Sequence, residues 1–385
     1  MKKNYLFVID RIENGGAERQ MLTVAKYISD NKKVYITSLH KPSNDLLNII
    51  KKYRFTYVPI STKEGKYFYE RVLGVLTLIK SLKNILTEYK IDKCVSFLEW
   101  SNVLSIIAAR DKGIPVYINV RNYLSRQYGS RHSLVLKIAK VIISRYYPHA
   151  DAIICNSHGI KKDLVDGFQV PSHLISVIQN SYPIDEIQIF SADYKKTSDR
   201  KVFCACGRLS DQKRFESLIL SFQKYIDESN RQDSLVIIGS GSNEEQIRGL
   251  IRTCNYDIDL LPHQENPLPI IANSDCFILH SDFEGFPNVL AEAIILGKDC
   301  ISVDCMTGPR ELLSGNVMTD YELPIVELKT LQYGLLYPYN SLQIEVDKEL
   351  VNALHTYTKN NYQFDKSNYG FLCEKEGRKK WLKAL

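Results

Sequence analysis

The chain has 385 residues, 44% of them hydrophobic and 24% charged, which is the balance of a folded protein rather than a disordered or fibrous one. This length suits two domains of about 150–200 residues better than a single core. No apolar run reaches the roughly 18 residues of a membrane-spanning helix, which argues against an integral membrane protein.

Charge is unevenly distributed along the chain. Residues 1–180 carry 28 Lys+Arg against 14 Asp+Glu, whereas the remaining residues carry 22 against 30. A basic first half predicts contact with something anionic, and nucleic acid, a phosphorylated substrate and an anionic bilayer surface all qualify. A solvated basic surface is the alternative. The nine cysteines show no CxxC pair and no ligand spacing, which indicates reduced thiols rather than disulfides or a zinc site.

Strand-like and helix-like segments alternate in the first half. We expect residues 5–9 to be a first strand rather than the core of a signal peptide, and residues 15–29 to be a helix. Further strands are expected at 34–38, 56–58, 93–97, 116–120 and 152–156, with further helices at 46–53 and 72–89. Such alternation predicts a parallel sheet covered by helices.

The pattern breaks at residues 181–199, which we interpret as a linker, and then restarts. Strands are expected at 202–206, 234–238, 259–261, 276–280 and 301–303, and helices at 215–225, 244–253, 267–273 and 288–296. We therefore predict two doubly wound α/β domains, residues 1–180 and 200–374. The basic, amphipathic segment 375–385 is expected to pack back onto the first domain, with a solvated tail as the alternative. Ligands of such sheets bind at the carboxyl ends of the strands, and a cleft between two units suits a two-part substrate.

Two short motifs lie in strand-to-helix turns. Asn14, Gly15 and Gly16 allow a tight turn and a close backbone approach before a helix N-terminus, which attracts anions. Arg208 and Lys213 follow the first strand of the second unit, where a guanidinium and an ammonium can converge on a diphosphate. An exposed basic loop is the alternative for this second motif.

The strongest motif is Ser281–Ala293, which follows one predicted strand and opens a helix. Glu284 precedes the turn and Glu292 lies about one turn into the helix, so the two carboxylates suit different hydroxyls of one bound molecule. The amides between them can hold an anion or a sugar. The alternative is a helix-end charge and a surface residue. We favour the first interpretation because Glu292 stands among apolar residues, where an idle carboxylate would be costly.

These motifs together resemble retaining GT-B glycosyltransferases of family 4. The resemblance rests on EGFPNVLAE, GRLSDQK, the Gly-Gly turn, IILGKDCISVDCMTGPREL, SFLEW and CNSHGIKKDL, which occur in the expected order over essentially the whole chain. It implies an α/β GT-B fold of two Rossmann-like domains facing a central cleft, the first binding the acceptor and the second the nucleotide sugar. In detail the chain is similar to bacterial enzymes that build surface polysaccharide, capsule, lipopolysaccharide or lipid-linked oligosaccharide.

The resemblance also implies an activity. The enzyme would move a hexose or N-acetylhexosamine, with retention, from a nucleotide sugar to a glycan or polyprenyl-diphosphate-linked acceptor. The donor is expected to be UDP-linked. Neither a metal nor another cofactor is expected, because two fixed cations can replace a metal at the leaving diphosphate. Asp257-Ile258-Asp259 is accordingly not interpreted as a metal motif.

Residue roles follow from the same resemblance. Arg208 and Lys213 would bind the donor diphosphate and stabilise its departure, Glu284 would bind sugar hydroxyls, and Glu292 would bind the ribose. The other donor contacts would be Gly16, Gly285, Phe286, Pro287, Asn288 and Val289. Many relatives place a histidine near the sugar, and this chain has Arg121 and Asn122 there instead. With Glu18, these two are candidate acceptor or sugar contacts, although Arg121 in an ordinary loop ion pair is the alternative.

The expected location is the cytoplasm, with peripheral contact to the cytoplasmic face of the inner membrane through the basic first half and without a nucleic-acid partner. Residues 131–147 form a basic amphipathic segment that suits either an anionic bilayer or a core-facing helix with solvated lysines. Other functions stay open. They are a nucleotide-sugar epimerase or a phosphorylase with two similar domains, and a non-catalytic glycan- or lipid-binding relative.

Overall fold

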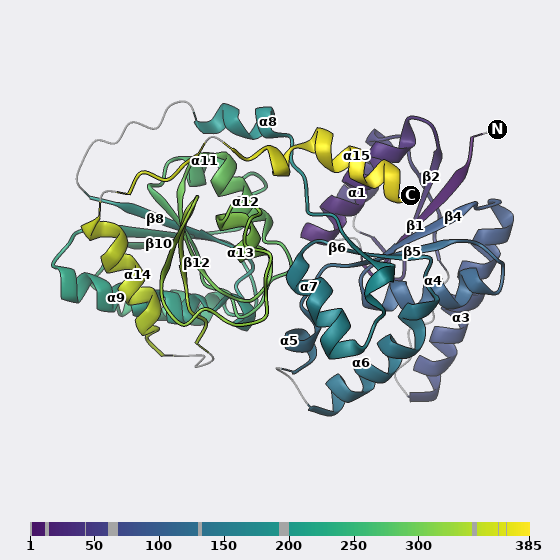
Figure 1. Cartoon of the computed structure of the whole chain (residues 1–385), viewed down its shortest axis with the longest axis horizontal. Helices are drawn as coiled ribbons and strands as arrows, with labels where there is room; N and C mark the ends of the chain where they lie inside the picture. The colour runs from purple at the N-terminus through teal and green to yellow at the C-terminus, as the bar shows by residue number, and fades with distance from the viewer. Residues whose placement is uncertain are drawn as a thin grey trace. The chain divides into compact units, whose positions relative to one another are not determined.

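The computed structural model describes residues 2–11, 15–42, 44–60, 68–129, 133–191, 200–340, 345–360, 362–366 and 368–385. The chain divides into two units that make most contacts within themselves (Figure 1). The first unit is Met1–Asn180 with Gly377–Leu385, and the second is Ser181–Glu376. Residues 181–191 of the expected linker thus belong to the second unit, and residues 192–199 lie outside the described residues.

The first unit is built on a parallel sheet in the order β3-β2-β1-β4-β5-β6-β7. Its described strands are β1 (Asn4–Ile9), β2 (Lys33–Ser38), β3 (Thr56–Tyr57), β4 (Lys93–Phe97), β5 (Val116–Val120), β6 (Ala152–Cys155) and β7 (Ile175–Val177). The helices are α1 (Gly16–Ser29), α2 (Asn44–Lys52), α3 (Phe68–Glu88), α4 (Glu99–Arg110), α5 (Leu124–Gly129), α6 (Ser133–Tyr146) and α7 (His158–Lys162).

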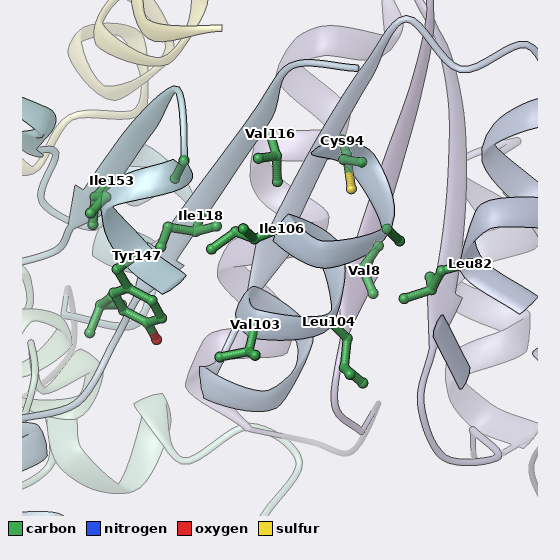
Figure 2. Packing of buried hydrophobic residues seen from close by; sticks show 14 of the residues in the cluster. Val8, Leu82, Cys94, Val103, Leu104, Ile106, Val116, Ile118, Tyr147 and Ile153 are labelled. Carbon is green, nitrogen blue, oxygen red and sulfur yellow. The ribbon is translucent and has the colours of Figure 1, made fainter. Parts of the chain in front are cut away.

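Both faces of this sheet are buried, which explains why its strands are continuous apolar runs. On one face the strands pack against α3, α4 and α6, and Figure 2 shows side chains of α4 among those of β1, β4, β5 and β6. The other face carries Phe7 and Ile9 of β1 against α1. None of the helices in the described ranges is long and apolar enough to cross a bilayer.

The C-terminal helix α15 (Glu374–Ala384) completes the apolar cluster on that second face. Trp381 is only 1% exposed and belongs to the same cluster as Tyr5 and Phe7. The Tyr5 hydroxyl donates a hydrogen bond to the main-chain oxygen of Leu385 at 3.1 Å, and Arg378 forms an ion pair with Asp30. The segment is therefore part of the first unit rather than a solvated tail.

The second unit repeats the architecture with the order β10-β9-β8-β11-β12-β14-β13. Its described strands are β8 (Val202–Cys206), β9 (Ser234–Ile238), β10 (Ile258–Leu261), β11 (Cys276–Leu279), β12 (Asp299–Val303), β13 (Lys329–Leu331) and β14 (Gly334–Tyr337), and β13 pairs antiparallel. The helices α9 (Phe215–Ser229), α10 (Glu244–Arg252) and α14 (Lys348–Lys359) cover one face. The other face carries α8 (Ile184–Gln188), α11 (Leu268–Ala272), α12 (Asn288–Ile295) and α13 (Gly308–Leu313). The predicted class of two Rossmann-like α/β domains is confirmed.

Candidate active site

The second sheet reverses its strand order at β8 and β11, and the loops that follow these two strands carry two of the predicted motifs. β8 leads into residues 207–214 and β11 into residues 280–287. In open parallel sheets, ligands bind beyond the carboxyl ends of the strands at such a reversal. The fold thus joins two segments that are far apart in the sequence at a natural binding position.

Lys213 and Glu284 meet at this position. The Lys213 ammonium and Oε1 of Glu284 form an ion pair, and the two side chains are only 16% and 10% exposed. The Lys213 chain passes close over Gly207, where a Cβ would lie 3.3 Å from its Cε. A donor phosphate can take over the ammonium while a sugar hydroxyl donates to the carboxylate, so the pair suits a ligand that carries both groups.

Backbone hydrogen bonds hold the surrounding loops together. The amide of Asp282 donates to the carbonyl of Gln212 at 2.8 Å, and Nε2 of Gln212 donates to the carbonyl of Phe283 at 2.7 Å. On the other side, the amide of Leu209 donates to the carbonyl of Ser240 at 3.1 Å. These bonds join the Lys213 loop to the two loops beside it and so position the ion pair.

Arg208 lies in the same loop as Lys213 but points its side chain into solvent. It is exposed, and it makes no hydrogen bond or ion pair with any other described residue. Its guanidinium therefore needs no rearrangement of the described contacts to bind an anionic ligand. The structure places it on the loop that carries Lys213, as the motif predicts, and its role stays a prediction.

The loop Gly285–Pro287 packs directly against the start of α13. The amide of Gly308 donates to the carbonyl of Gly285 at 3.0 Å. A Cβ at Gly308 would lie 2.8 Å from that carbonyl oxygen and 2.8 Å from Cα of Phe286. Only glycine allows the two backbones to approach so closely. Phe286 is itself buried in the core, which anchors the loop from below.

One side of α12 is partly exposed and carries the second glutamate. Asn288, Val289 and Glu292 are half-buried, whereas Leu290 and Ala291 between them are buried. The spacing places these three residues on one helix face. The Tyr182 hydroxyl donates to Oδ1 of Asn288 at 2.7 Å. Glu292 is thus not enclosed by apolar side chains, as the sequence suggested, but lies on the same face as the first residue of the helix.

Two buried residues that the sequence analysis missed lie at the edges of the loops that follow β8 and β11, Arg214 at the end of the first and His280 at the start of the second. Arg214 adopts a left-handed conformation with φ 52° and is buried, with guanidinium nitrogens 3.6 Å from carboxylate oxygens of Asp282 and Asp347. His280 is buried, with Nδ1 2.5 Å from the Tyr337 hydroxyl and Nε2 3.0 Å from Oγ of Ser217. Burial, with the nearby positive charge of Arg214, holds the pKa of His280 well below its usual value.

In the first unit, Gly16 and Glu18 form the start of α1. Gly15 is the N-cap and Gly16 the first helical residue. The Glu18 carboxylate folds back over the cap, because a Cβ at Gly15 would lie 2.3 Å from its Oε2. A glutamate at the third helical position commonly closes a helix start in this way. Asn14 lies outside the described residues.

Arg121 has a packing role in the first unit. It is buried at the end of β5, its guanidinium lies 5.0 Å from the ring centre of Phe97 and 5.9 Å from that of Trp381, and NH1 donates to Oδ1 of Asn180 at 2.9 Å. Asn122 beside it is half-buried. The loop ion pair considered for Arg121 and a sugar contact by either residue stay predictions.

The corresponding reversal in the first sheet, between β1 and β4, carries a carboxylate pair that the motifs did not predict. Asp10 follows β1 and its Oδ1 accepts hydrogen bonds from the amide and hydroxyl of Ser101 at 2.7 and 2.6 Å. Leu98, with φ 74°, turns the chain into α4 and places Glu99 at the first helical position. Burial and the neighbouring Asp10 raise the pKa of Glu99 to about 7.

The Asp257-Ile258-Asp259 segment is not arranged as a metal site. Asp257 forms an ion pair with Arg200, and Asp259 is exposed on β10. No group of three or more His, Cys, Asp or Glu side chains in the described part of the chain is placed to hold a metal ion. Metal independence of the reaction stays a prediction.

Family models match two adjoining stretches of the chain. The model described as Glycosyltransferase Family 4 matches residues 14–186, and the model described as Glycosyl transferases group 1 matches residues 186–320. An uncharacterized glycosyltransferase of Methanocaldococcus jannaschii is 30% identical over 62% of this chain and 62% of its own length. The chain thus matches less than two thirds of that relative. A Campylobacter jejuni N-acetylgalactosamine-N,N'-diacetylbacillosaminyl-diphospho-undecaprenol 4-alpha-N-acetylgalactosaminyltransferase is 28% identical over 63% of this chain and 79% of its own length.

Solved structures share the fold across the whole chain. The Anabaena protein HepE in complex with UDP-glucose superimposes with a TM-score of 0.73 at 17% identity, covering 99% of this chain and 98% of that one. The lipopolysaccharide outer core galactosyltransferase WaaB gives a TM-score of 0.70 at 20% identity, covering 99% of each chain. The fold and its paired Rossmann-like units define the GT-B class of transferases. Together with the two family models, they show that this chain belongs to family 4 of the glycosyltransferases.

Proposed function

We propose that this protein transfers a hexose or N-acetylhexosamine from a UDP-linked sugar to a lipid-linked or lipopolysaccharide-type acceptor glycan. The observation that carries the proposal is the enclosed Lys213–Glu284 pair at the strand-order reversal of the second sheet. The names of similar proteins supply the substrate class. They include two Campylobacter jejuni N-acetylgalactosaminyltransferases that act on undecaprenol-linked saccharides and a Salmonella typhimurium lipopolysaccharide 1,6-galactosyltransferase. An Escherichia coli relative is named for the donor UDP-Gal.

The residues of the second unit suit the departure of a diphosphate. Arg208 and Lys213 would bind the donor phosphates, and Lys213 would exchange the Glu284 carboxylate for a phosphate oxygen as the donor enters. Glu284 would then accept from a sugar hydroxyl, and Glu292 from the ribose hydroxyls. Positive groups fixed where charge develops lower the barrier to departure without a metal.

The proposed transfer retains the anomeric configuration. The bond between the sugar C1 and the diphosphate oxygen breaks, and the acceptor hydroxyl oxygen forms its bond to C1 on the same face. The acceptor proton passes to the departing phosphate oxygen, so no separate base is needed. Arg208 and Lys213 hold the negative charge of the diphosphate until that proton arrives.

The first unit would bind the acceptor, and the enzyme would work at the cytoplasmic face of a membrane that carries lipid-linked saccharides. The excess of Lys and Arg in residues 1–180 supports a diphosphate-linked acceptor on this unit, because phosphate groups are anionic. This placement is independent of the donor assignment and is tested separately.

Nucleotide release from UDP-, GDP- and dTDP-sugars, with and without undecaprenyl-diphosphate saccharides, tests the donor and acceptor. We expect UDP release that the acceptor accelerates, and loss of about a hundredfold or more in Lys213→Met. Lys224→Met is the matched control, because Lys224 lies on α9 in an exposed pair with Glu228. Product NMR reports the anomeric configuration, and EDTA treatment tests metal independence. Turnover by Lys213→Met at the wild-type rate would refute the site.

A further inference from the structure

Helix α6 (Ser133–Tyr146) has apolar side chains on two opposite sides. On the inner side, Ile143 is buried, and Leu136, Ala139 and Ile142 pack against the core. On the outer side, Leu134, Ile138 and Val141 are 65%, 52% and 68% exposed. Their spacing of four and three residues places them in one stripe along the helix. Packing against the core therefore accounts for the apolar residues on the inner side of this helix but not for those on its outer side. Of the segment 131–147 singled out in the sequence, Arg131 lies outside the described residues.

Cationic side chains flank the outer stripe. Lys137, Lys140 and Arg145 are all exposed, and residues 133–147 contain no Asp or Glu. Within the described part of the chain, none of the three forms an ion pair with a carboxylate. Lys140 is near enough to Asp163 to interact with that carboxylate electrostatically. The outer side of α6 thus offers aliphatic side chains and a net positive charge on the same surface. We call Leu134, Lys137, Ile138, Lys140, Val141 and Arg145 the outer face of α6.

Exposed apolar residues of the second unit lie in the opposite electrostatic setting. Val317, Leu323 and Val326 are exposed in the segment between α13 and β13. Asp320, Glu322 and Glu327 stand among them in the sequence. An anionic surface would repel that segment and attract the outer face of α6. The pairing of apolar and cationic groups is therefore not a general property of the surface of this protein.

We propose that the outer face of α6 docks on the surface of an anionic phospholipid bilayer. A helix with apolar and basic residues on its exposed side lies in the plane of the interface, where the apolar side chains enter the headgroup region and the cations meet lipid phosphates. A second copy of the chain fits this face poorly, because two such faces would bring six cationic side chains together. The helix lies at the outside of the first unit (Figure 1), and the exposed fractions of Leu134, Ile138 and Val141 show that the described residues leave this face open.

The expected effect of each group follows from its chemistry. One Lys or Arg near an anionic surface strengthens binding about fivefold, so neutralising three should weaken it by about a hundredfold. Replacing one aliphatic side chain that enters the bilayer with glutamine should weaken vesicle binding about tenfold. The cationic part should disappear at high salt, and the apolar part should persist.

The experiment is vesicle co-sedimentation of the full chain with phosphatidylcholine alone and with phosphatidylcholine mixed with phosphatidylglycerol. We expect binding to the mixed vesicles only, and loss of binding in Ile138→Gln/Val141→Gln and in the triple variant of Lys137, Lys140 and Arg145 to Gln. The matched controls lie in the second unit and should bind as wild type. They are Val326→Gln for the apolar change and the triple variant of Arg252, Lys348 and Lys359 to Gln for the charge.

Three outcomes would overturn the proposal. They are equal binding to both vesicle types, unchanged binding in the α6 variants, and a wild-type dimer that the α6 variants convert to monomer in size-exclusion chromatography. All substituted side chains are exposed, so the melting temperature should not move and misfolding is checked directly. Nucleotide release from the soluble donor should be the same in every variant. Failure of docking is thereby distinguished from failure of the proposed glycosyl transfer.

Discussion

Removing either member of the Lys213–Glu284 pair should cost stability, and removing both should cost less than the sum. With side chains 16% and 10% exposed, the pair lies between a surface pair, worth about 0–1 kcal/mol, and a fully buried pair, whose disruption costs about 3–5 kcal/mol. We therefore expect Lys213→Met to destabilise the second unit by about 2 kcal/mol, because it leaves a carboxylate in little water. Glu284→Gln should cost slightly less. The double variant should recover about 1–2 kcal/mol relative to additivity.

The assay must report on the second unit alone. Trp100 and Trp381 both belong to the first unit, so tryptophan fluorescence would follow the wrong transition. Hydrogen exchange of the amides in β8 and β11 measures the free energy of opening of the second unit's sheet. Transfer should be lost in both single variants and should not return in the double variant, even though stability does. Additive losses of stability, or transfer that recovers with stability, would refute the coupling and the functional role together.

Three further predictions concern other contacts in the two units. Gly308→Ala places a Cβ 2.8 Å from the Gly285 carbonyl oxygen and should cost about 1–3 kcal/mol and weaken donor binding in calorimetry, whereas unchanged affinity would show that the loop yields freely. Since burial lowers the pKa of His280, the unfolded chain takes up the proton first, and below about pH 6.5 the second unit should lose up to about 1.4 kcal/mol per pH unit relative to His280→Gln. A difference between these two proteins that does not change with pH in hydrogen exchange would contradict this. Trp381→Ala should destabilise the first unit by about 3–5 kcal/mol in urea titrations followed by Trp100 fluorescence, and an unchanged midpoint would show that α15 is dispensable.

The central strands were predictable because they are buried on both faces and read as apolar runs, whereas β7, β13 and β14 were not predicted. β4, β5, β8 and β9 begin and end where the sequence analysis placed them. Helix α4 was missed for the opposite reason. Its buried side includes Ser101, Asn102 and Ser105, which hide the helical periodicity that apolar residues would have shown. Their partners include Asp10, which follows β1, and the carbonyl of Asn119 in β5, and these contacts become visible only in the fold.

The candidate site was predictable in its parts but not in its contacts. Lys213 and Glu284 stood out through their motifs, yet they are 71 residues apart and nothing local indicated their ion pair. Nothing in the sequence distinguished Arg214, because its partner Asp347 lies far along the chain at the start of α14. For Arg121, too, the contacts could not be predicted from the local sequence. Many relatives place a histidine at this point, which suggested a sugar contact, whereas the packing of Trp381 against Arg121 depends on the far end of the chain.

The position of α15 sets an order on biosynthesis. The first unit needs Gly377–Leu385 to cover one face of its sheet, and these residues leave the ribosome only after the whole of Ser181–Glu376. During translation, the side chains of Phe7, Phe97 and Arg121 are therefore made before Trp381, the residue that later covers them. The first unit is thus synthesised first but completes its folding last. A nascent chain that stops before α15 is made would expose the apolar face of the first sheet to chaperones and proteases.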